Sequence, residues 1–387
     1  MSDLLAISGA PIFDGERWHD NAALLIEFGH VSAVVAADQL PANAEHVVLD
    51  GGSIVPGFVD LQVNGGGGVL FNNDPSVEAI RTICAAHAQF GTTALLPTLI
   101  TDTVEINERA IAAGAEAAAA GVPGFFGLHL EGPHLAVARK GTHDPSLIRP
   151  MDAEDLARLQ AAATVLPNLI CTVAAETVTP EQITALAQAG VTVSLGHSDA
   201  DYATASTAFG AGATMATHLF NAMSQMGHRE PGVVGATLMH GGVFAGLIAD
   251  GIHVHAAAIS VALRGKQGPG RIFLVTDAMS QTGTDLRTLT LNGRTIYRAD
   301  GALRLADGTL AGADLDMIDA VRFMHSEIGV AWEEALRMAS LYPAEAIGAE
   351  AEHGHLRPGA VASFVHLSPA RDVLATWING TEQYRAG

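Results

Sequence analysis

The chain has 387 residues, of which 49% are hydrophobic and 16% are charged, and its formal net charge is −21. A chain of this length can bury a large core, and it can hold a barrel of about 250 residues with a smaller domain beside it. The acidic charge argues against nucleic-acid binding, because phosphate backbones are recognised by basic surfaces. An anionic small molecule would need a local cluster of cations to bind against this charge.

Two cysteines, Cys84 and Cys171, lie in apolar surroundings. We expect both to be buried free thiols, which fit a reducing cytoplasm. The N-terminus shows no basic segment followed by an apolar stretch, and no apolar run reaches the length of a membrane span. The sequence therefore predicts a cytoplasmic protein with no membrane partner.

In chain order, the first segment is a run of alternating apolar and polar residues, 1–55, with turns such as Asp50-Gly51-Gly52. Residues 352–387 show a similar pattern at the other end. Each segment alone is too short for a stable sheet. We therefore expect one small β-sandwich domain built from 1–55 and 352–387, with a catalytic domain of residues 56–351 inserted between them.

Between these flanks, short apolar runs alternate with helical stretches. There are eight such runs: Phe58–Val63, Thr93–Ile100, Phe125–Glu131, Leu169–Glu176, Val191–His197, Thr214–Phe220, Phe244–Asp250 and Ile272–Asp277. Apolar runs without alternation are typical of strands buried on both faces of a parallel sheet. Eight β–α units predict a (β/α)8 barrel of the TIM type. An open doubly wound sheet would more naturally begin with a Gly-rich dinucleotide turn, which is absent.

The intervening segments have helical spacing, and plausible helix starts are Thr179-Pro180 and Ser198-Asp199. Expected helical stretches include Ser76–Phe90, Val104–Ala120, Ala153–Ala163 and Asp199–Phe209. After the eighth run, the hairpin-rich stretch Thr288–Gly312 is interpreted as an elaborated loop.

Three polar residues, Glu131, His197 and His218, each lie at the end of an apolar run. In a barrel, the ends of parallel strands converge on one face, where active sites lie. One carboxylate and two imidazoles leave an open coordination position on a metal ion, as in catalytic sites. These residues therefore form the candidate metal-ligand set.

Asp277 follows the eighth run and is the group best placed for proton transfer. Beside a metal-bound water it can take the water proton and later deliver it to a leaving amine. The chain has no Gly-x-Ser-x-Gly motif and no reactive Cys arrangement, so water is favoured as the nucleophile.

Two loops carry cations after the metal-ligand runs, Arg139–Pro145 and Met226–Gly232. Arg229 is the stronger phosphate candidate, because a guanidinium offers a fork of donors. Solvated loop charges are an equally good interpretation from the residues alone. The Gly65–Gly68 run lacks the Lys-Ser/Thr of a phosphate-binding loop, so a flexible loop near the ligand is expected.

Taken together, the motifs identify a known family. They are Val55–Asp60, Gly127–Pro133, Lys140–His143, Gly196–Ser198, Thr217–Met223, Arg229–Gly232, Ala249–His253 and Val275–Ala278. The chain resembles the N-acetylglucosamine-6-phosphate deacetylases of the amidohydrolase superfamily over essentially its whole length. The most specific segments are Leu-Glu-Gly-Pro, Thr-His-Leu-Phe-Asn-Ala-Met and Arg-Glu-Pro-Gly.

The resemblance implies a role for each matching residue. Glu131, His197 and His218 would bind the metal, Asp277 would act as general base and then general acid, and His143 would help to polarise the acetamido carbonyl. Asn221, the Ala222 backbone and His253 would contact the sugar phosphate. The loop of His228 and Arg229 would reach the phosphate across the interface of a homodimer.

One segment departs from the wider superfamily, which often holds a second metal with His-x-His where this chain has Gln62-Val63-Asn64. Gln and Asn are poor ligands for Zn²⁺-like ions. We therefore expect one divalent metal per subunit, Zn²⁺ first with Fe²⁺ or Co²⁺ as alternatives, and Gln62 and Asn64 beside it. His134 and Gln225 receive no role.

The implied reaction is hydrolysis of N-acetyl-D-glucosamine 6-phosphate to D-glucosamine 6-phosphate and acetate, in amino-sugar catabolism and cell-wall sugar recycling. Galactosamine and mannosamine phosphates stay open as substrates. The alternative enzymes are amidohydrolases that act on carboxylates, such as dihydroorotase-like or N-acylamino-acid deacylases. A non-catalytic relative would be expected to lack ligands or the acid–base group, yet all four residues are present.

Overall fold

The computed structural model describes residues 4–387 and is organised around eight parallel strands. They are β8 (Phe58–Val63), β11 (Thr92–Ile100), β12 (Leu128–Glu131), β13 (Leu169–Val173), β14 (Thr192–Leu195), β15 (Met215–Ala216), β16 (Phe244–Leu247) and β17 (Ile272–Leu274). Each strand pairs with the next in sequence. Closure comes just beyond β17, where Val63 forms a parallel bridge with Ala278 and the Asp277 N–H donates to the Gln62 carbonyl at 3.0 Å. The predicted barrel is confirmed.

Several strands end before the polar residues that were expected to close them. β14 stops at Leu195, β15 at Ala216 and β17 at Leu274. The reason is local backbone conformation: His197, His218 and Asp277 have φ of +47°, +31° and +50°. A left-handed residue cannot continue a strand, so these side chains stand on the turns that follow it.

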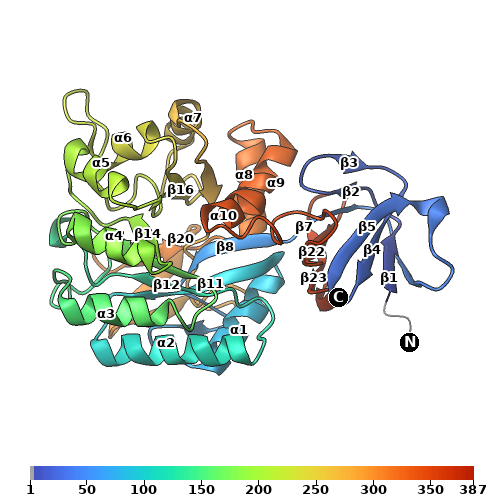
Figure 1. Ribbon diagram of the computed structural model, residues 1–387, viewed down its shortest axis with the longest axis horizontal. Helices are drawn as coiled ribbons and strands as arrows, with labels where there is room; N and C mark the ends of the chain where they lie inside the picture. The colour runs from blue at the N-terminus through green and yellow to red at the C-terminus, as the bar shows by residue number, and fades with distance from the viewer. Residues whose placement is uncertain (1–3) are drawn as a thin grey trace.

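Ten helices cover the barrel (Figure 1). They are α1 (Val77–Ala88), α2 (Val104–Ala119), α3 (Ala153–Ala162), α4 (Pro180–Gln188), α5 (Tyr202–Gly210), α6 (Gly232–Met239), α7 (Ala256–Gly265), α8 (Met317–Ser326), α9 (Trp332–Ala339) and α10 (Leu341–Ala346), with short 3-10 turns η1 (Ala37–Gln39) and η2 (Val137–Arg139). The start of α4 is confirmed, with Thr179 forming a capping box with Gln182.

The predicted start of α5 at Ser198-Asp199 is wrong, because Asp201 is the N-cap. Ser198 Oγ and the Asp199 N–H instead donate to Glu176, at 2.6 Å and 2.7 Å. These bonds hold the chain in a non-helical turn directly after His197.

The two ends of the chain build a pair of packed sheets beside the barrel (Figure 1). One contains β1 (Leu4–Ser8), β4 (Ala22–Glu27), β5 (His30–Ala36) and β6 (Glu45–Val48); the other contains β2 (Ile12–Phe13), β3 (Trp18–His19), β7 (Ser53–Pro56), β22 (Phe364–Leu367), β23 (Val373–Ile378) and β24 (Thr381–Arg385). Ile7 and Leu24 of the first sheet share one apolar cluster with Ile54 and Phe364 of the second. The predicted fold class, a barrel with a β-sandwich from both termini, is confirmed, whereas the boundaries at 55/56 and 351/352 stay a prediction.

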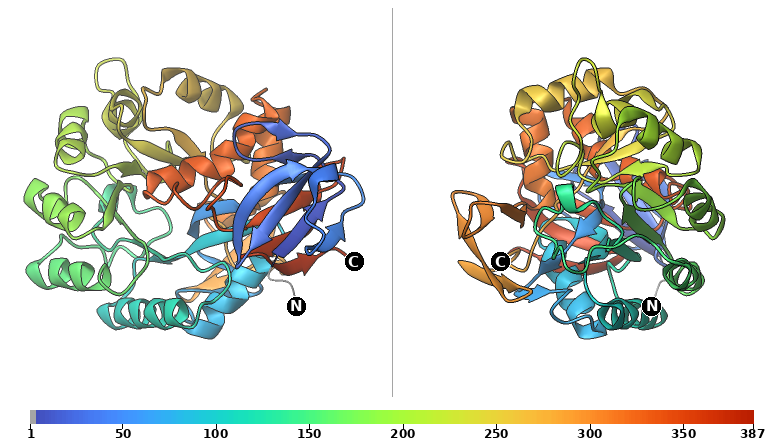
Figure 2. Two further views of the ribbon diagram at one scale, coloured as in Figure 1. Left: turned by 45° about the vertical axis from the view of Figure 1, so that its right-hand side comes forward. Right: turned by 90° about the vertical axis from the view of Figure 1, so that its left-hand side faces the viewer.

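A separate antiparallel sheet follows β17, as expected for the hairpin-rich stretch Thr288–Gly312. Its antiparallel strands are β18 (Thr288–Leu291), β19 (Arg294–Ala299), β20 (Ala302–Leu305) and β21 (Leu310–Ala313). This hairpin sheet, orange in Figure 2, projects from one side of the barrel. An isolated bridge between Ala278 and Ala313 ties it to the barrel next to Asp277.

The Gly65–Gly68 run forms a hydrogen-bonded hairpin rather than an irregular loop, with β9 (Gly65–Gly66) paired to β10 (Val69–Leu70). Cys84 and Cys171 are buried and free, as predicted. Among residues 4–387, no helix combines the length and the apolar character that crossing a membrane requires.

Candidate active site

Three predicted metal ligands meet at the carboxyl ends of the strands. Oε1 of Glu131 lies 3.2 Å from Nε2 of His197 and 3.1 Å from Nε2 of His218, and the two imidazole nitrogens are 3.1 Å apart. All three residues are buried. Ligand atoms that surround a tetrahedral ion at about 2.0–2.2 Å lie about 3.3–3.6 Å from one another. The trio therefore has nearly the spacing that a bound metal requires.

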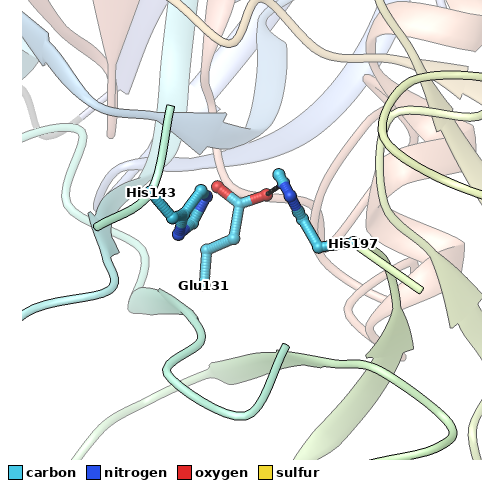
Figure 3. Close-up of side chains that lie close together, drawn as sticks. All are labelled: Glu131, His143 and His197. Atoms are coloured by element: carbon cyan, nitrogen blue, oxygen red, sulfur yellow. Dashed lines mark hydrogen bonds and ion pairs between the residues drawn. The ribbon is translucent and has the colours of Figure 1, made fainter. Parts of the chain in front are cut away.

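The hydrogen bond of His197 supports the same interpretation. Its Nδ1 donates to the backbone carbonyl of Arg139 at 2.8 Å, which leaves the lone pair on Nε2. An imidazole ligand is commonly oriented by such a bond from its other nitrogen. His143, Glu131 and His197 also offer ligand atoms within 4.8 Å of one another (Figure 3). We favour the set with His218, because its atoms are closer together and His143 is engaged elsewhere.

The charges at this site are strongly coupled. Burial by itself would raise the pKa of Glu131, but hydrogen bonds from His197 and His218 hold it well below its usual value. The carboxylate is thus ionised and concentrates negative charge on the side that faces the two imidazoles. That is the electrostatic environment in which a divalent cation is stabilised.

Asp277 lies next to this trio on the cavity wall. Its Oδ1 accepts a hydrogen bond from Asn64 Nδ2 at 2.6 Å and one from Gln62 Nε2 at 3.3 Å. Its Oδ2 receives no donor from residues 4–387. Burial, together with the charge of Glu131, raises the pKa of Asp277 to about 6. A carboxylate with this pKa is well suited to exchange a proton near neutral pH.

His143 approaches the trio from the loop after β12, and its ring centroid lies 4.3 Å from that of His197. Nδ1 of His143 contacts Thr101, with 2.8 Å to Oγ1 and 3.3 Å to the backbone N. Burial, with a further contribution from neighbouring His197, lowers the pKa of His143 well below its usual value. His143 is therefore a neutral imidazole at neutral pH.

These groups face a cavity of about 340 Å³. It is lined by Asn64, Leu70, Asn72, Ile100, Glu131, Ala138, Arg139, Gly141, Thr142, His143, His197, His218, Asn221, Ala222, Ile248, His253, Asp277, Met279, Leu291, Thr309, Leu310 and Gly312. The lining includes nine of the residues singled out from the sequence. Gln62 is not in the lining, but its side-chain amide contacts the carboxylates of both Glu131 and Asp277.

His228 and Arg229 are the predicted site residues that the single chain does not bring to the cavity. Both are exposed and neither lines it. Glu230, in contrast, folds back, and its Oε1 accepts bonds from the backbone N–H groups of Tyr202 and Gly232, at 2.7 Å and 2.9 Å. The loop is therefore anchored by Glu230 while the side chain before it stays in solvent.

The far side of the cavity is formed by Asn221, Ala222 and His253. Nδ1 of His253 lies 2.6 Å from Oδ2 of Asp250, and burial of that carboxyl is outweighed by this bond, which lowers the pKa of Asp250. Ala222 has φ of +48°. Such a conformation is uncommon for a residue with a Cβ and recurs at functional sites.

The two residues without a predicted role lie outside the cavity. His134 Nδ1 is 3.2 Å from the Arg149 carbonyl, and its Nε2 is 3.8 Å from Asp155, so it fixes the loop behind Glu131. Gln225 Nε2 donates to the carbonyls of Phe220 and Met223, at 2.7 Å and 2.9 Å, and so stabilises the turn after His218. Both positions are structural.

Several lining residues were missed from the sequence. Asn72 follows β10, Ile100 ends β11, and Leu291, Thr309 and Leu310 come from the hairpin sheet. Asp250 is outside the lining but contacts His253, and it did have a signal, since it lies three residues before His253 in a matched motif. Leu291, Thr309 and Leu310 carry no local signal, because only the packing of the hairpin sheet against the barrel brings them to the site.

A closed parallel barrel with a carboxylate–imidazole cluster and an acid–base carboxylate at its strand ends defines a barrel hydrolase with a candidate metal centre. Comparison with known proteins agrees: the Amidohydrolase family matches residues 53–382. The N-acetylgalactosamine-6-phosphate deacetylase of Shewanella sp. (strain ANA-3) is 40% identical over 99% of this chain and 97% of its own length. The N-acetylglucosamine-6-phosphate deacetylase of Haemophilus influenzae is 35% identical over 92% of this chain and 93% of its own length.

Solved structures give the same result. The crystal structure of N-acetylglucosamine-6-phosphate deacetylase from Pasteurella multocida superposes with a TM-score of 0.95 at 35% identity, covering 99% of this chain and 100% of that one. A variant of the Mycobacterium smegmatis enzyme in complex with N-acetyl-D-glucosamine-6-phosphate gives 0.89 at 32% identity, covering 98% of this chain and 99% of that one. The chain therefore belongs to the amidohydrolase family, among its amino-sugar-phosphate deacetylases, and is a hydrolase.

Proposed function

We propose that the chain hydrolyses the acetamide of N-acetyl-D-glucosamine 6-phosphate, giving D-glucosamine 6-phosphate and acetate. The observation that carries the proposal is the meeting of Glu131, His197 and His218 with Asp277 on one wall of the cavity. Full-length relatives named for this activity support the choice of substrate.

Glu131, His197 and His218 would hold one divalent metal, with Zn²⁺ first and Fe²⁺ or Co²⁺ as alternatives, since a site of this kind binds several ions and availability decides. Such an ion supplies a water of lowered pKa and polarises the carbonyl that is attacked. Gln62 and Asn64 orient the neighbouring carboxylates, and Asn64 in particular keeps Oδ1 of Asp277 occupied.

Asp277 takes the proton of the attacking water through Oδ2 and passes it to the nitrogen of the acetamide. The C–N bond then breaks, the amine leaves as –NH2 and takes up the second water proton from the new carboxyl group, and the resulting acetate retains the water oxygen. Neutral His143 donates a hydrogen bond to the carbonyl oxygen as negative charge develops there. Closely spaced groups on turns after rigid strands hold this geometry with little reorganisation.

Binding of the phosphate requires a cation, and the cavity of one chain offers little positive charge. Among residues 4–387, Arg139 is the only Arg or Lys in the cavity lining, and its Nε is 2.7 Å from Asp199 Oδ1. Arg229 is exposed and free to extend away from its own chain. The proposal therefore includes a homodimer in which Arg229, with His228 beside it, reaches the phosphate of the neighbouring subunit, while Asn221, the Ala222 backbone and His253 bind it from within.

A second substrate is N-acetyl-D-galactosamine 6-phosphate, because the relative that is 40% identical over 99% of the chain is named for that sugar. The deciding experiment is acetate release by the metal-reconstituted enzyme from the 6-phosphates of the gluco, galacto and manno acetylhexosamines. Unphosphorylated sugars and acylamino acids serve as controls. Preference for the gluco phosphate supports the proposal, preference for the galacto phosphate replaces its substrate, and turnover of acylamino acids alone overturns it.

The wider role that fits this reaction is amino-sugar catabolism and cell-wall sugar recycling in the cytoplasm. Fractionation of cells that produce the native protein tests the location. Loss of growth on N-acetylglucosamine after deletion of the reading frame, restored by the intact reading frame, tests the role.

A further inference from the structure

Thr101 follows directly after β11 and is as deeply buried as the ligand cluster, with 1% of its surface exposed. It presents two groups to one atom of His143. Its backbone N–H donates to Nδ1 at 3.3 Å, and its hydroxyl oxygen lies 2.8 Å from the same nitrogen. His143 is itself 1% exposed, so water does not compete for this contact.

The backbone donor determines which ring nitrogen carries the hydrogen. An N–H group cannot accept, so Nδ1 must present its lone pair to Thr101, and the hydrogen of the neutral ring then lies on Nε2. The hydroxyl can donate to the same lone pair and limits rotation of the ring. The ring lines the cavity and lies close to Glu131 and His197 (Figure 3). With Nδ1 held by Thr101, Nε2 is the nitrogen left to meet a ligand.

The surrounding backbone leaves room for this arrangement. Gly132, directly after the ligand Glu131, has φ of +92°, and a Cβ on it would lie 2.3 Å from Oγ1 of Thr101. Any larger residue would displace the hydroxyl from His143. The glycine after a metal ligand and the threonine after the neighbouring strand thus form one packing unit around the imidazole.

We propose that Thr101 is a positioning residue that fixes His143 as the Nε2–H tautomer and so supplies a hydrogen-bond donor to the substrate carbonyl. The inference rests on the proposed amide hydrolysis for its catalytic meaning. The tautomer itself is a property of the resting protein and does not depend on the substrate.

The test compares three variants of the metal-loaded full-length enzyme. Thr101→Val removes the hydroxyl with little change of shape, and Thr101→Ser retains it. Thr92→Val is the matched control, because Thr92 begins β11, the strand that Thr101 follows, is also 1% exposed, and its hydroxyl has no partner within residues 4–387. Metal content and kcat and KM for the sugar phosphate are measured for each.

Loss of one neutral hydrogen bond that orients a catalytic group should lower kcat of Thr101→Val about two- to thirteen-fold at unchanged KM and metal content. Thr101→Ser and Thr92→Val should stay within two-fold of the wild type. Equal kcat in Thr101→Val and Thr92→Val overturns the inference. Metal loss confined to Thr101→Val also overturns it, because Thr101 would then act on the metal site.

Nitrogen-15 spectra of histidine-labelled protein give a readout that a merely structural role would not move. The signal of His143 is assigned by its absence from His143→Gln. A wild-type ring with bare Nδ1 and protonated Nε2 supports the inference, and a protonated Nδ1 in the wild type overturns it. In Thr101→Val the backbone N–H keeps the tautomer, and loss of the hydroxyl donor should shift the Nδ1 signal. Because the spectrum needs no turnover, failure of the proposed substrate would be seen separately in the acetate assay.

Discussion

The side-chain amide of Gln62 lies 3.4 Å from both carboxylate oxygens of Glu131. The same Nε2 is 3.3 Å from Asp277 Oδ1, so a neutral donor stands between two acidic groups. A second cation in this position would need ligands that an amide nitrogen cannot provide. The relationship therefore explains how the two carboxylates can lie close together.

From this arrangement we predict about one equivalent of metal per chain. His197→Ala and His218→Ala should lose metal and activity together while remaining folded, because the barrel core is apolar. Elemental analysis of the purified proteins, with circular dichroism for folding, checks this. His366→Ala is the control, since His366 is buried in β22 and, among residues 4–387, its side chain bonds only to the Gly51 carbonyl, at 2.8 Å. Two equally tight metals in the wild type would contradict the prediction.

Asp277→Asn should retain metal and substrate affinity but lose kcat by about 10²–10⁴-fold, the usual contribution of general acid–base catalysis. The amide oxygen can still accept the bond from Asn64, so the shape of the site is kept. Steady-state kinetics and metal analysis measure both quantities. As a control, Asp250→Asn should raise KM and change kcat little, because Asp250 contacts His253 rather than the reacting atoms. A near-normal kcat in Asp277→Asn would require a different base.

The barrel and the meeting of Glu131, His197 and His218 could be predicted because both depend on patterns that the chain carries locally. A strand buried on both faces must be apolar throughout, and a polar residue at its end has little reason to be there except function. His129 shows the limit of that argument. It lies two residues before Glu131 in β12, yet its nitrogens are satisfied by the Leu61 carbonyl at 2.9 Å and Thr172 Oγ1 at 2.7 Å.

What the sequence could not provide are contacts made by backbone atoms and by distant loops. The Arg139 carbonyl orients His197, and a backbone atom has no side-chain signature. Thr309 and Leu310 reach the cavity only because the hairpin sheet folds back onto the barrel. The strand ends were misplaced for a related reason: His197 and Asp277 have φ of +47° and +50°, a backbone conformation that no apolar pattern records.

Arg229→Ala should raise KM for the sugar phosphate sharply and hardly change turnover of unphosphorylated N-acetylglucosamine. A charge-assisted hydrogen bond is worth about 1.5–3 kcal/mol, or one to two decades in kcat/KM. Lysine should rescue only in part, because an ammonium cannot make a two-pronged contact. Arg264 is also an exposed arginine, and Arg264→Ala should leave KM and kcat unchanged for both substrates. Equal losses on the two substrates would remove the phosphate assignment.

Mixing Arg229→Ala with Asp277→Asn tests whether the arginine serves the neighbouring subunit. A hybrid dimer then contains one site with an intact Asp277 and an intact partner Arg229, so part of the activity should return. Subunit exchange is verified by native mass spectrometry of differently tagged proteins. Exchange without recovery would assign Arg229 to the site of its own chain.

The last prediction concerns stability and Asp60, which lies in β8 and is fully buried. Its Oδ2 is 2.5 Å from Thr276 Oγ1, and burial raises its pKa from 3.8 to about 7. The folded state therefore holds this proton up to higher pH than the unfolded state does. The resulting stability is fully present below pH 3.8 and is lost as pH rises towards 7, by about 4 kcal/mol in all. Asp60→Asn cannot ionise, and its amide can serve the same partners. Urea unfolding at pH 5 and pH 8 measures the free energy of unfolding, and that of Asp60→Asn should increase relative to the wild type as pH rises.

Asp307→Asn is the control, because Asp307 is exposed and hydrogen bonds from Thr309 lower its pKa. Its free energy of unfolding should differ from that of the wild type by the same amount at pH 5 and pH 8. A constant difference for Asp60→Asn as well would mean that the Asp60 carboxyl is already ionised at pH 5.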